Sequence, residues 1–264
     1  MARRTSAPVT PELFDRKLRA MRRDRAARIG PDMFLFERAF DECLDRLKDI
    51  ARTYSRALLV GCPSPEWPLH LREYAFEVET VDPGQIFASA SGGTQAEEDR
   101  YDFGEDRYDL CVAVGTLDTV NDLPLALQLI RRALRRDAPL IGAFAGGNSL
   151  VALRASFIEA GRSEGRVVAR THPRIEAPTL AQLLSSAGFS MPVVDVDRVR
   201  LRYSSLEGLV RDLRAMGATS CLAQRAPALT KTGATYVGQA FAALATDGKT
   251  EELIEILHFL GWNQ

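Results

Sequence analysis

The sequence predicts an α/β fold with a mostly parallel sheet, and three observations indicate it. Residues 57–60 form a short apolar run that ends at Gly61, as a buried strand does before a tight loop. A second apolar run, residues 78–81, ends in the acid Asp82. Residues 109–114 are almost continuously apolar, which is typical of a central parallel strand. An acid about 20 residues after such a glycine is expected where an α/β sheet holds a ribose. The sequence therefore also predicts a nucleotide-type ligand.

The α/β domain is expected to span residues 54–264, with a helical extension over residues 1–53. Residues 1–30 hold nine basic residues against three acids. Such a segment is either a mitochondrial transit peptide or a basic helix lying over the domain, and we favour the helix. Thr10 and Pro11 supply a cap and a first-turn proline for its start.

The remaining elements follow from hydrophobic periodicity and from residues that begin or end helices. We expect helices over residues 34–53, 68–74, 124–135, 149–160, 179–187, 206–216 and 234–245, and further strands over residues 139–144 and 193–203. Gly188 would cap the end of the helix before it. Residues 253–260 fit either period, but their place at the end of an α/β alternation favours a final strand.

Residues 88–107 have the least regular pattern, because a small polar stretch is followed by clustered acids. A solvated loop is the first interpretation of such a stretch. In nucleoside-binding α/β folds, however, the loop after the third strand carries an acid that meets the adenine amino group. Glu98 and Asp99 stand where that acid is expected.

Composition excludes several classes of protein. A net charge of −1 gives no general attraction to nucleic acid or to anionic lipid. The four cysteines form no closely spaced pair, which favours a reducing compartment over a disulfide framework. No histidine has a carboxylate or thiol at metal-ligand spacing, so we predict no metal site. No apolar run approaches the ~20 residues that span a bilayer. We expect a cytoplasmic protein without a membrane span or a nucleic-acid partner.

The chain resembles the class I S-adenosylmethionine (SAM)-dependent methyltransferases, and several strings support this resemblance. They are Phe14-Asp15-Arg16, Val120-Asn121-Asp122-Leu123-Pro124, Ile130-Arg131-Arg132-Ala133-Leu134, Gly146-Gly147, Ala187-Gly188-Phe189, Met216-Gly217-Ala218-Thr219 and Gly261-Trp262. The chain is most similar to the branch that holds the biotin-pathway malonyl-carrier-protein O-methyltransferases and the mitochondrial respiratory complex I assembly factor. The strings after residue 190 favour the assembly-factor side of that branch.

The resemblance implies a Rossmann-like, seven-stranded, mostly parallel sheet with an antiparallel last strand. It also implies SAM as cofactor and a protein or carrier-bound substrate, with a subunit of the respiratory complex as a partner. The assembly-factor branch is associated with hydroxylation of an arginine on a complex I subunit, and a eukaryotic member would lie in the mitochondrial matrix. The cofactor site that it implies comprises Gly61, Cys62, Asp82, Glu98, Asp99 and Val114.

The glycine-rich loop of the family is altered in this chain. The family's acid at the end of the first strand falls on Leu59, and its second and third glycines fall on Pro63 and Pro65. Proline fixes φ and has no N–H, whereas this loop normally presents bare backbone to the methionine part of SAM. Two hypotheses follow: an enzyme with a modified loop, or an assembly protein that has lost SAM binding. Binding of NAD would meet the same missing glycines.

Three candidate residues also have ordinary structural explanations. Asp82 would serve equally well to cap the turn before Pro83. Asn121 or Asp122 would serve as the N-terminal cap of the helix that follows. Cys62 is a candidate redox residue, but a small apolar filler is the favoured interpretation.

Overall fold

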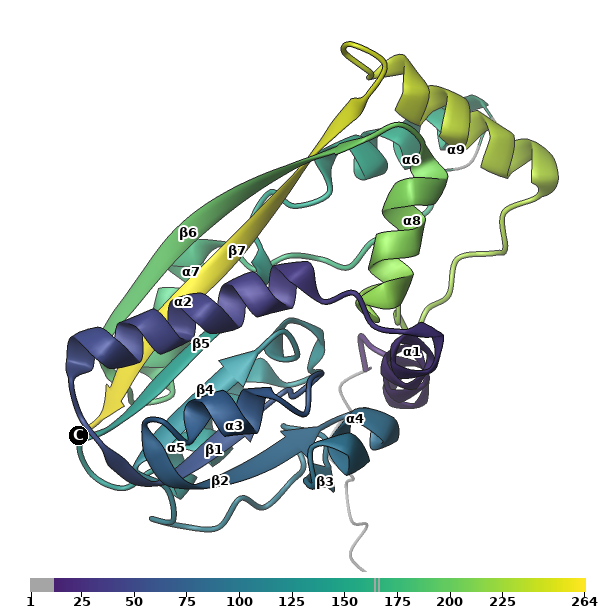
Figure 1. Ribbon diagram of the computed structural model, residues 1–264. Helices are drawn as coiled ribbons and strands as arrows, with labels where there is room; N and C mark the ends of the chain where they lie inside the picture. Colours follow the sequence, from purple (N-terminus) through teal and green to yellow (C-terminus); the bar gives the residue numbers. More distant parts are fainter. Residues whose placement is uncertain (1–11, 164, 166) are drawn as a thin grey trace, which may run out of the picture.

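A computed structural model describes residues 12–163, 165 and 167–264 of the protein. Its centre is one seven-stranded sheet in the order β3-β2-β1-β4-β5-β7-β6 (Figure 1). The strands are β1 (Tyr54–Val60), β2 (Ala75–Asp82), β3 (Thr94–Gln95), β4 (Leu110–Val114), β5 (Ala138–Gly146), β6 (Ser190–Tyr203) and β7 (Thr250–Asn263). The first five run parallel, and β7 is antiparallel to both of its neighbours, β5 and β6. The predicted fold class is therefore confirmed.

Helices cover both faces of this sheet. They are α1 (Arg16–Ile29), α2 (Phe34–Ile50), α3 (Trp67–Leu71), α4 (Gln85–Ala90), the 3-10 turn η1 (Leu117–Thr119), α5 (Leu123–Ala133), α6 (Val151–Ser163), α7 (Ala177–Ser186), α8 (Leu206–Ala215) and α9 (Lys231–Ala243). The α2 and α3 helices lie on one face, and α5 and α7 lie on the other. No helix in the described part of the chain has the length and apolar character needed to cross a bilayer.

Successive residues of the central strands supply two separate cores. Leu59 and Val112 pack with α2 and α3, whereas their neighbours Leu58 and Cys111 pack with α5 and α7. Side chains alternate across a strand, so a strand buried on both faces must be apolar at every position. This explains why β4 is buried along its whole length and why its sequence shows no alternation.

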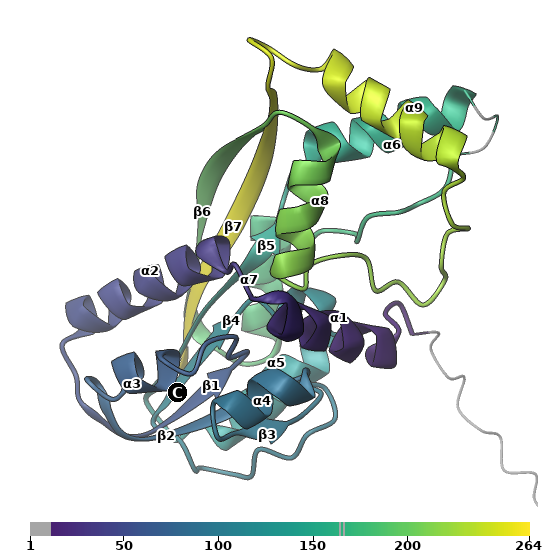
Figure 2. The ribbon, with the colours of Figure 1, turned by 45° about the vertical axis from the view of Figure 1, so that its right-hand side comes forward.

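The β6 and β7 strands continue beyond the parallel strands as a two-stranded ribbon. Figure 1 shows α6 and α9 at the far end of this ribbon, with α8 between that end and α1. Figure 2 shows α1 lying beside α4 and α8, across the edge where the parallel strands end. The α1 helix therefore lies where open α/β sheets bind their ligands.

The structure corrects the predicted start of the first helix. Thr10 and Pro11, the predicted cap and first-turn proline, lie outside the described residues. The α1 helix begins at Arg16, and Asp15 caps it by accepting a hydrogen bond from the Leu18 N–H at 2.9 Å. Phe14 pairs with Leu222 in an isolated β-bridge. This pairing joins the residues before α1 to the segment after α8.

The structure corrects part of the prediction of a solvated loop over residues 88–107: residues 96–107 form no helix or strand, but two of their acids are buried. The α4 helix extends from just before this region into its first residues, and β3 lies within it. The side chains of Glu98 and Asp99 are buried, at 0% and 4% relative exposure. A buried charge has to be paired, and the partners of these two acids come from α1.

Candidate functional site

Gly61 occupies a position that no other residue fits. Its φ is +79°, and a Cβ atom there would lie 2.3 Å from the carbonyl oxygen of Val114. Its N–H donates to the carbonyl of Val81 at 2.8 Å. Gly61 therefore lies between the ends of β2 and β4. The structure thus brings the predicted residues Gly61 and Val114 together at the carboxyl edge of the sheet.

The carboxylate of Asp82 is fully occupied by hydrogen bonds within the protein. Its Oδ1 accepts from the Gly84 N–H at 2.7 Å and from Arg23 Nε at 2.7 Å. Its Oδ2 accepts from the Cys62 N–H at 2.9 Å and from Arg23 Nη2 at 2.5 Å. A carboxylate has about four acceptor sites, and Asp82, at 0% exposure, uses all of them.

Glu98 and Asp99 are held in the same way by other arginines of α1. Arg19 Nη1 and Nη2 donate to Glu98 at 2.7 and 2.9 Å. Arg16 Nη1 and Nη2 donate to Asp99 at 2.5 and 2.7 Å. We call Asp82, Glu98 and Asp99 the acid trio, and Arg16, Arg19 and Arg23 the arginine face of α1. The three arginines follow the i, i+3, i+7 spacing that places side chains on one side of a helix.

The pairs with Arg19 and Arg16 favour the charged forms of Glu98 and Asp99 despite their burial. Burial raises the pKa of Glu98, but the charge and hydrogen bonds of Arg19 outweigh burial and hold that pKa below its ordinary value. Burial likewise opposes the effect of Arg16 on Asp99, and the pKa of Asp99 is also lowered. Arg19 further donates to the Thr116 carbonyl at 2.7 Å and to Thr119 Oγ1 at 3.1 Å. The arginine face is thus joined to the turn after β4.

The residues of this site do not fit an adenosyl group with α1 in this position. A ribose would need acceptor sites on Asp82, and all of these are taken by Arg23 and two backbone N–H groups.

The thiol of Cys62 is buried. Burial, and to a smaller extent the negative charge of Asp82, raises the pKa of this thiol to about 12. The thiol is therefore a poor nucleophile and agrees with a filler role. No group of three or more metal-ligating side chains occurs in the part of the chain that the structure describes.

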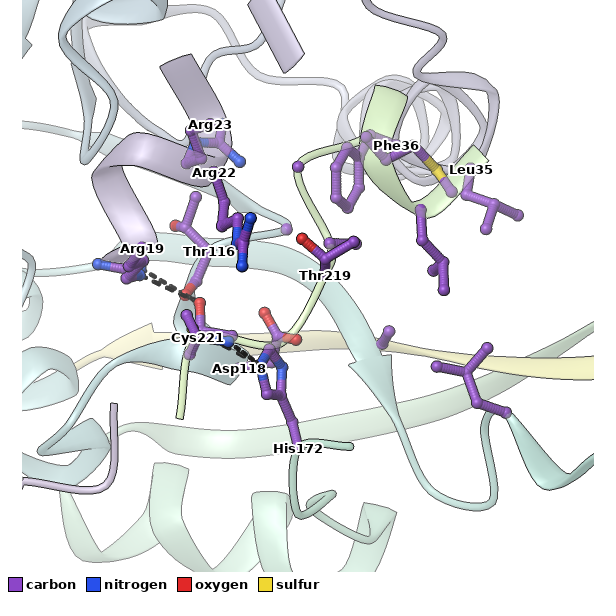
Figure 3. A pocket seen from close by; sticks show the side chains of 18 of the residues that line it. Arg19, Arg22, Arg23, Leu35, Phe36, Thr116, Asp118, His172, Thr219 and Cys221 are labelled. Carbon is purple, nitrogen blue, oxygen red and sulfur yellow. Dashed lines mark hydrogen bonds between the residues drawn. The ribbon is translucent and has the colours of Figure 1, made fainter. Parts of the chain in front are cut away.

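A pocket lies beside the arginine face, at the carboxyl ends of β4 and β5. Its cavity volume is about 80 Å³. Its walls come from α1, α2, the turn at η1, α8 and two segments near residues 172 and 219. Figure 3 shows Arg22 extending from α1 into the space between Thr116 and Thr219. A second cavity, of about 250 Å³ by the same measure, shares several lining residues with this pocket, among them Arg22 and Arg174.

Three polar side chains in the pocket, Arg174, Asp118 and His172, have hydrogen-bond partners within the protein. Arg174 Nη1 donates to Asp118 Oδ2 at 3.3 Å and to the Ala145 carbonyl at 3.1 Å. Burial raises the pKa of Asp118 even though Arg174 opposes this effect. His172 Nε2 accepts from the Cys221 N–H at 2.9 Å, as Figure 3 shows. Burial, with the charge of Arg174, lowers the pKa of His172 to about 4, so this imidazole is neutral.

Sequence reasoning missed the arginine face and the pocket residues. The sequence predicts Asn121 or Asp122 as a helix cap, and the structure confirms this role for Asp122, whose side chain accepts from the Leu125 N–H at 3.0 Å. Asn121 Oδ1 instead accepts from the Phe14 N–H at 2.8 Å. The regular spacing of Arg16, Arg19 and Arg23 was the one signal available.

Comparison with known proteins identifies the family of this chain. Residues 32–192 match the methyltransferase domain family. The chain is 30% identical to the human protein named "Arginine-hydroxylase NDUFAF5, mitochondrial", over 98% of this chain and 79% of that protein. The zebrafish protein of the same name is 29% identical, over 95% of this chain and 82% of that protein.

Two further similarities are weaker, one because it covers about half of the chain and the other because the sequence identity is low. A malonyl-[acyl-carrier protein] O-methyltransferase of Xylella fastidiosa is 32% identical, but over only 55% of this chain and 48% of that protein. The solved structure of the YcgJ protein from Bacillus subtilis superposes with a TM-score of 0.57 at 13% identity, covering 84% of this chain and 97% of that one. At that identity the structural likeness concerns the fold alone.

Proposed function

Because this chain belongs to the methyltransferase domain family, we propose that it is a methyltransferase-like enzyme that modifies a protein component during assembly of respiratory complex I. The pocket beside the arginine face is the proposed site of that modification. It lies at the carboxyl ends of β4 and β5, where open α/β sheets carry their functional groups.

One observation carries this proposal, namely the extent of the likeness. The arginine-hydroxylase relatives match 95–98% of the chain. That span includes α1, α8 and the segment after α8, all of which line the pocket. The carrier-protein methyltransferase matches only 55% of the chain. The assembly branch therefore accounts for the walls of the pocket as well as for the common fold.

A non-catalytic assembly role is the second candidate, and one observation favours it. The acid trio is bound to the arginine face, and Pro63 and Pro65 replace two glycines of the family's loop. SAM would have to displace α1 to reach Asp82. Under this second candidate the protein keeps the fold and its partner surface but uses no adenosyl cofactor.

Deleting the gene in its own host tests both candidates. The proposal predicts that complex I assembly fails and that one subunit loses the mass of a small added group, a methyl group or an oxygen atom. Native gels would measure assembly, and mass spectrometry of the subunits would measure the modification. Failed assembly with unchanged subunit masses would favour the non-catalytic candidate. Normal assembly would overturn both.

Calorimetric titration of the purified protein with SAM and S-adenosylhomocysteine addresses the cofactor separately. The first candidate predicts saturable binding of SAM, which requires α1 to release the acid trio, whereas the second candidate predicts no binding at millimolar ligand. Micromolar binding would contradict the second candidate, and the absence of binding at millimolar ligand would contradict SAM as the cofactor of the first.

A further inference from the structure

We propose that the pocket and the cavity that adjoins it bind a carboxylic acid with an apolar chain. This inference rests on the proposed function for the place of the site and goes beyond it, because the ligand is a small organic acid and not a protein component. It is carried by two arginines with unused donors, by an apolar opposite wall, and by the absence of acids from the described lining of the adjoining cavity.

Arg22 is the first unused cation. Its side chain makes no hydrogen bond or ion pair with any residue that the structure describes, and its Nε atom is buried without a partner. The neighbouring arginines of α1, Arg19 and Arg23, are matched by Glu98 and Asp82. A buried donor without an acceptor is costly. An anion entering the pocket would remove that cost.

Arg174 is the second cation, and it lines both cavities. Only its Nη1 has acceptors in the described chain, Asp118 and the Ala145 carbonyl. Its Nε and Nη2 groups have none there, although the side chain is only 11% exposed. A carboxylate suits a guanidinium of this kind, because two parallel N–H groups can bind its two oxygens.

The opposite wall supplies the apolar part of the recognition. Leu35, Phe36, Met216 and Ile254 line the pocket, and Leu213 lines both the pocket and the adjoining cavity. An anion with no apolar chain would leave this wall uncovered. Burial of each methylene against such a wall strengthens binding.

The adjoining cavity continues the same chemistry. Its described lining contains Arg22, Arg170 and Arg174 and no acidic residue. Phe157, which lies under the Arg170 guanidinium at 5.9 Å, adds another apolar surface. A cationic group would meet three arginines there. The adjoining cavity therefore selects an anion, and in the first pocket the one acid of the described lining, Asp118, is already paired with Arg174. The size of the two cavities admits a chain of several carbons.

Titrating the purified full chain with octanoate, octylamine and acetate tests the proposal. Octanoate should bind saturably in the micromolar to millimolar range. Octylamine, which has the same chain and the opposite charge, should not bind. Acetate, which has the charge without the chain, should bind at least about tenfold more weakly, since it forgoes the apolar contacts. Binding of octylamine as tight as that of octanoate, or no saturation by octanoate, would overturn the proposal.

Two single-residue variants test whether octanoate binds at Arg22. Arg22→Gln should weaken octanoate binding about tenfold, because it removes a charge-assisted hydrogen bond. It should also fold normally, since Arg22 has no described partner to lose. The matched control is Arg211→Gln on α8, which removes an exposed guanidinium outside the two cavities. An equal loss in both variants would contradict the assignment. The titration needs no partner protein, so its failure and a failure of the deletion experiment are distinguishable.

Discussion

At the scale of single residues, the pair formed by Arg23 and Asp82 is one of the buried contacts that hold α1 in place. Both side chains are buried, and the two groups share two hydrogen bonds. We expect Arg23→Gln to lower the free energy of unfolding by about 3–5 kcal/mol, because it leaves a buried carboxylate without its counter-charge. Urea denaturation followed by circular dichroism measures this difference.

An exposed pair on α2 provides the control for that prediction. Arg38 binds Asp197 with a side chain that is 57% exposed, so Arg38→Gln should change stability by no more than about 1 kcal/mol. The double variant Arg23→Gln with Asp82→Asn should recover part of the loss, because the uncompensated charge is gone. Equal effects of Arg23→Gln and Arg38→Gln would show that burial does not govern the strength of these pairs.

The spacing of residues along the chain predicts some residues of the candidate site and not others. Gly61 and Asp82 follow directly from a strand–loop–strand pattern, because the distance between them along the chain is set by one crossover. The arginine face cannot be predicted in this way, since its partners lie 59 to 83 positions away. Three basic residues on one side of a helix are equally typical of a solvated surface. Only the packed position of α1 decides between the two.

At the scale of elements, α1 is held more by ion pairs than by apolar packing. Its buried residues are Leu18, Ala26 and two arginines, Arg19 and Arg23. We therefore expect the double variant Arg16→Gln with Arg19→Gln to speed amide hydrogen exchange across α1 by about tenfold or more, because local opening of a helix depends on its own contacts. Exchange in β4 and β5 should change less.

The control for this experiment lies on the same helix. Arg22→Gln removes a guanidinium that has no partner in the described chain, so the exchange of the α1 amides should stay as in the unaltered protein. Unchanged exchange in the double variant would mean that Leu18, Ala26 and the remaining Arg23–Asp82 pair are enough to hold α1 against the domain.

The elements that sequence reasoning missed are the short ones. The α4 helix and β3 have six and two residues, too few for a hydrophobic period to appear. Each forms because neighbouring elements hold it. The Ile86 N–H donates to Asp24 on α1 at 2.9 Å, and β3 pairs with the end of β2. Longer elements such as α5 were predicted within a few residues, since their apolar faces are complete in the sequence.

At the scale of the whole molecule, the sheet separates two cores, and two buried histidines link its stability to pH. His172 is 7% exposed and His258 is 2% exposed. Burial lowers the pKa of both, and the pKa of His172 falls to about 4. An unfolded histidine has a pKa near 6.5. Below that pH these histidines bind protons in the unfolded chain but not in the folded protein, so acid favours unfolding.

The size of this effect follows from the shift of His172 alone. Each unit of pKa difference corresponds to about 1.4 kcal/mol, so the free energy of unfolding should fall by up to about 3 kcal/mol as the pH drops from 6.5 to 4. His172→Gln retains an acceptor for the Cys221 N–H but cannot take up a proton. Urea denaturation at several pH values should show the variant losing less stability than the unaltered protein over this interval, with little difference in slope above pH 7. Parallel curves below pH 6.5 would mean that the imidazole of His172 is not held neutral by the fold.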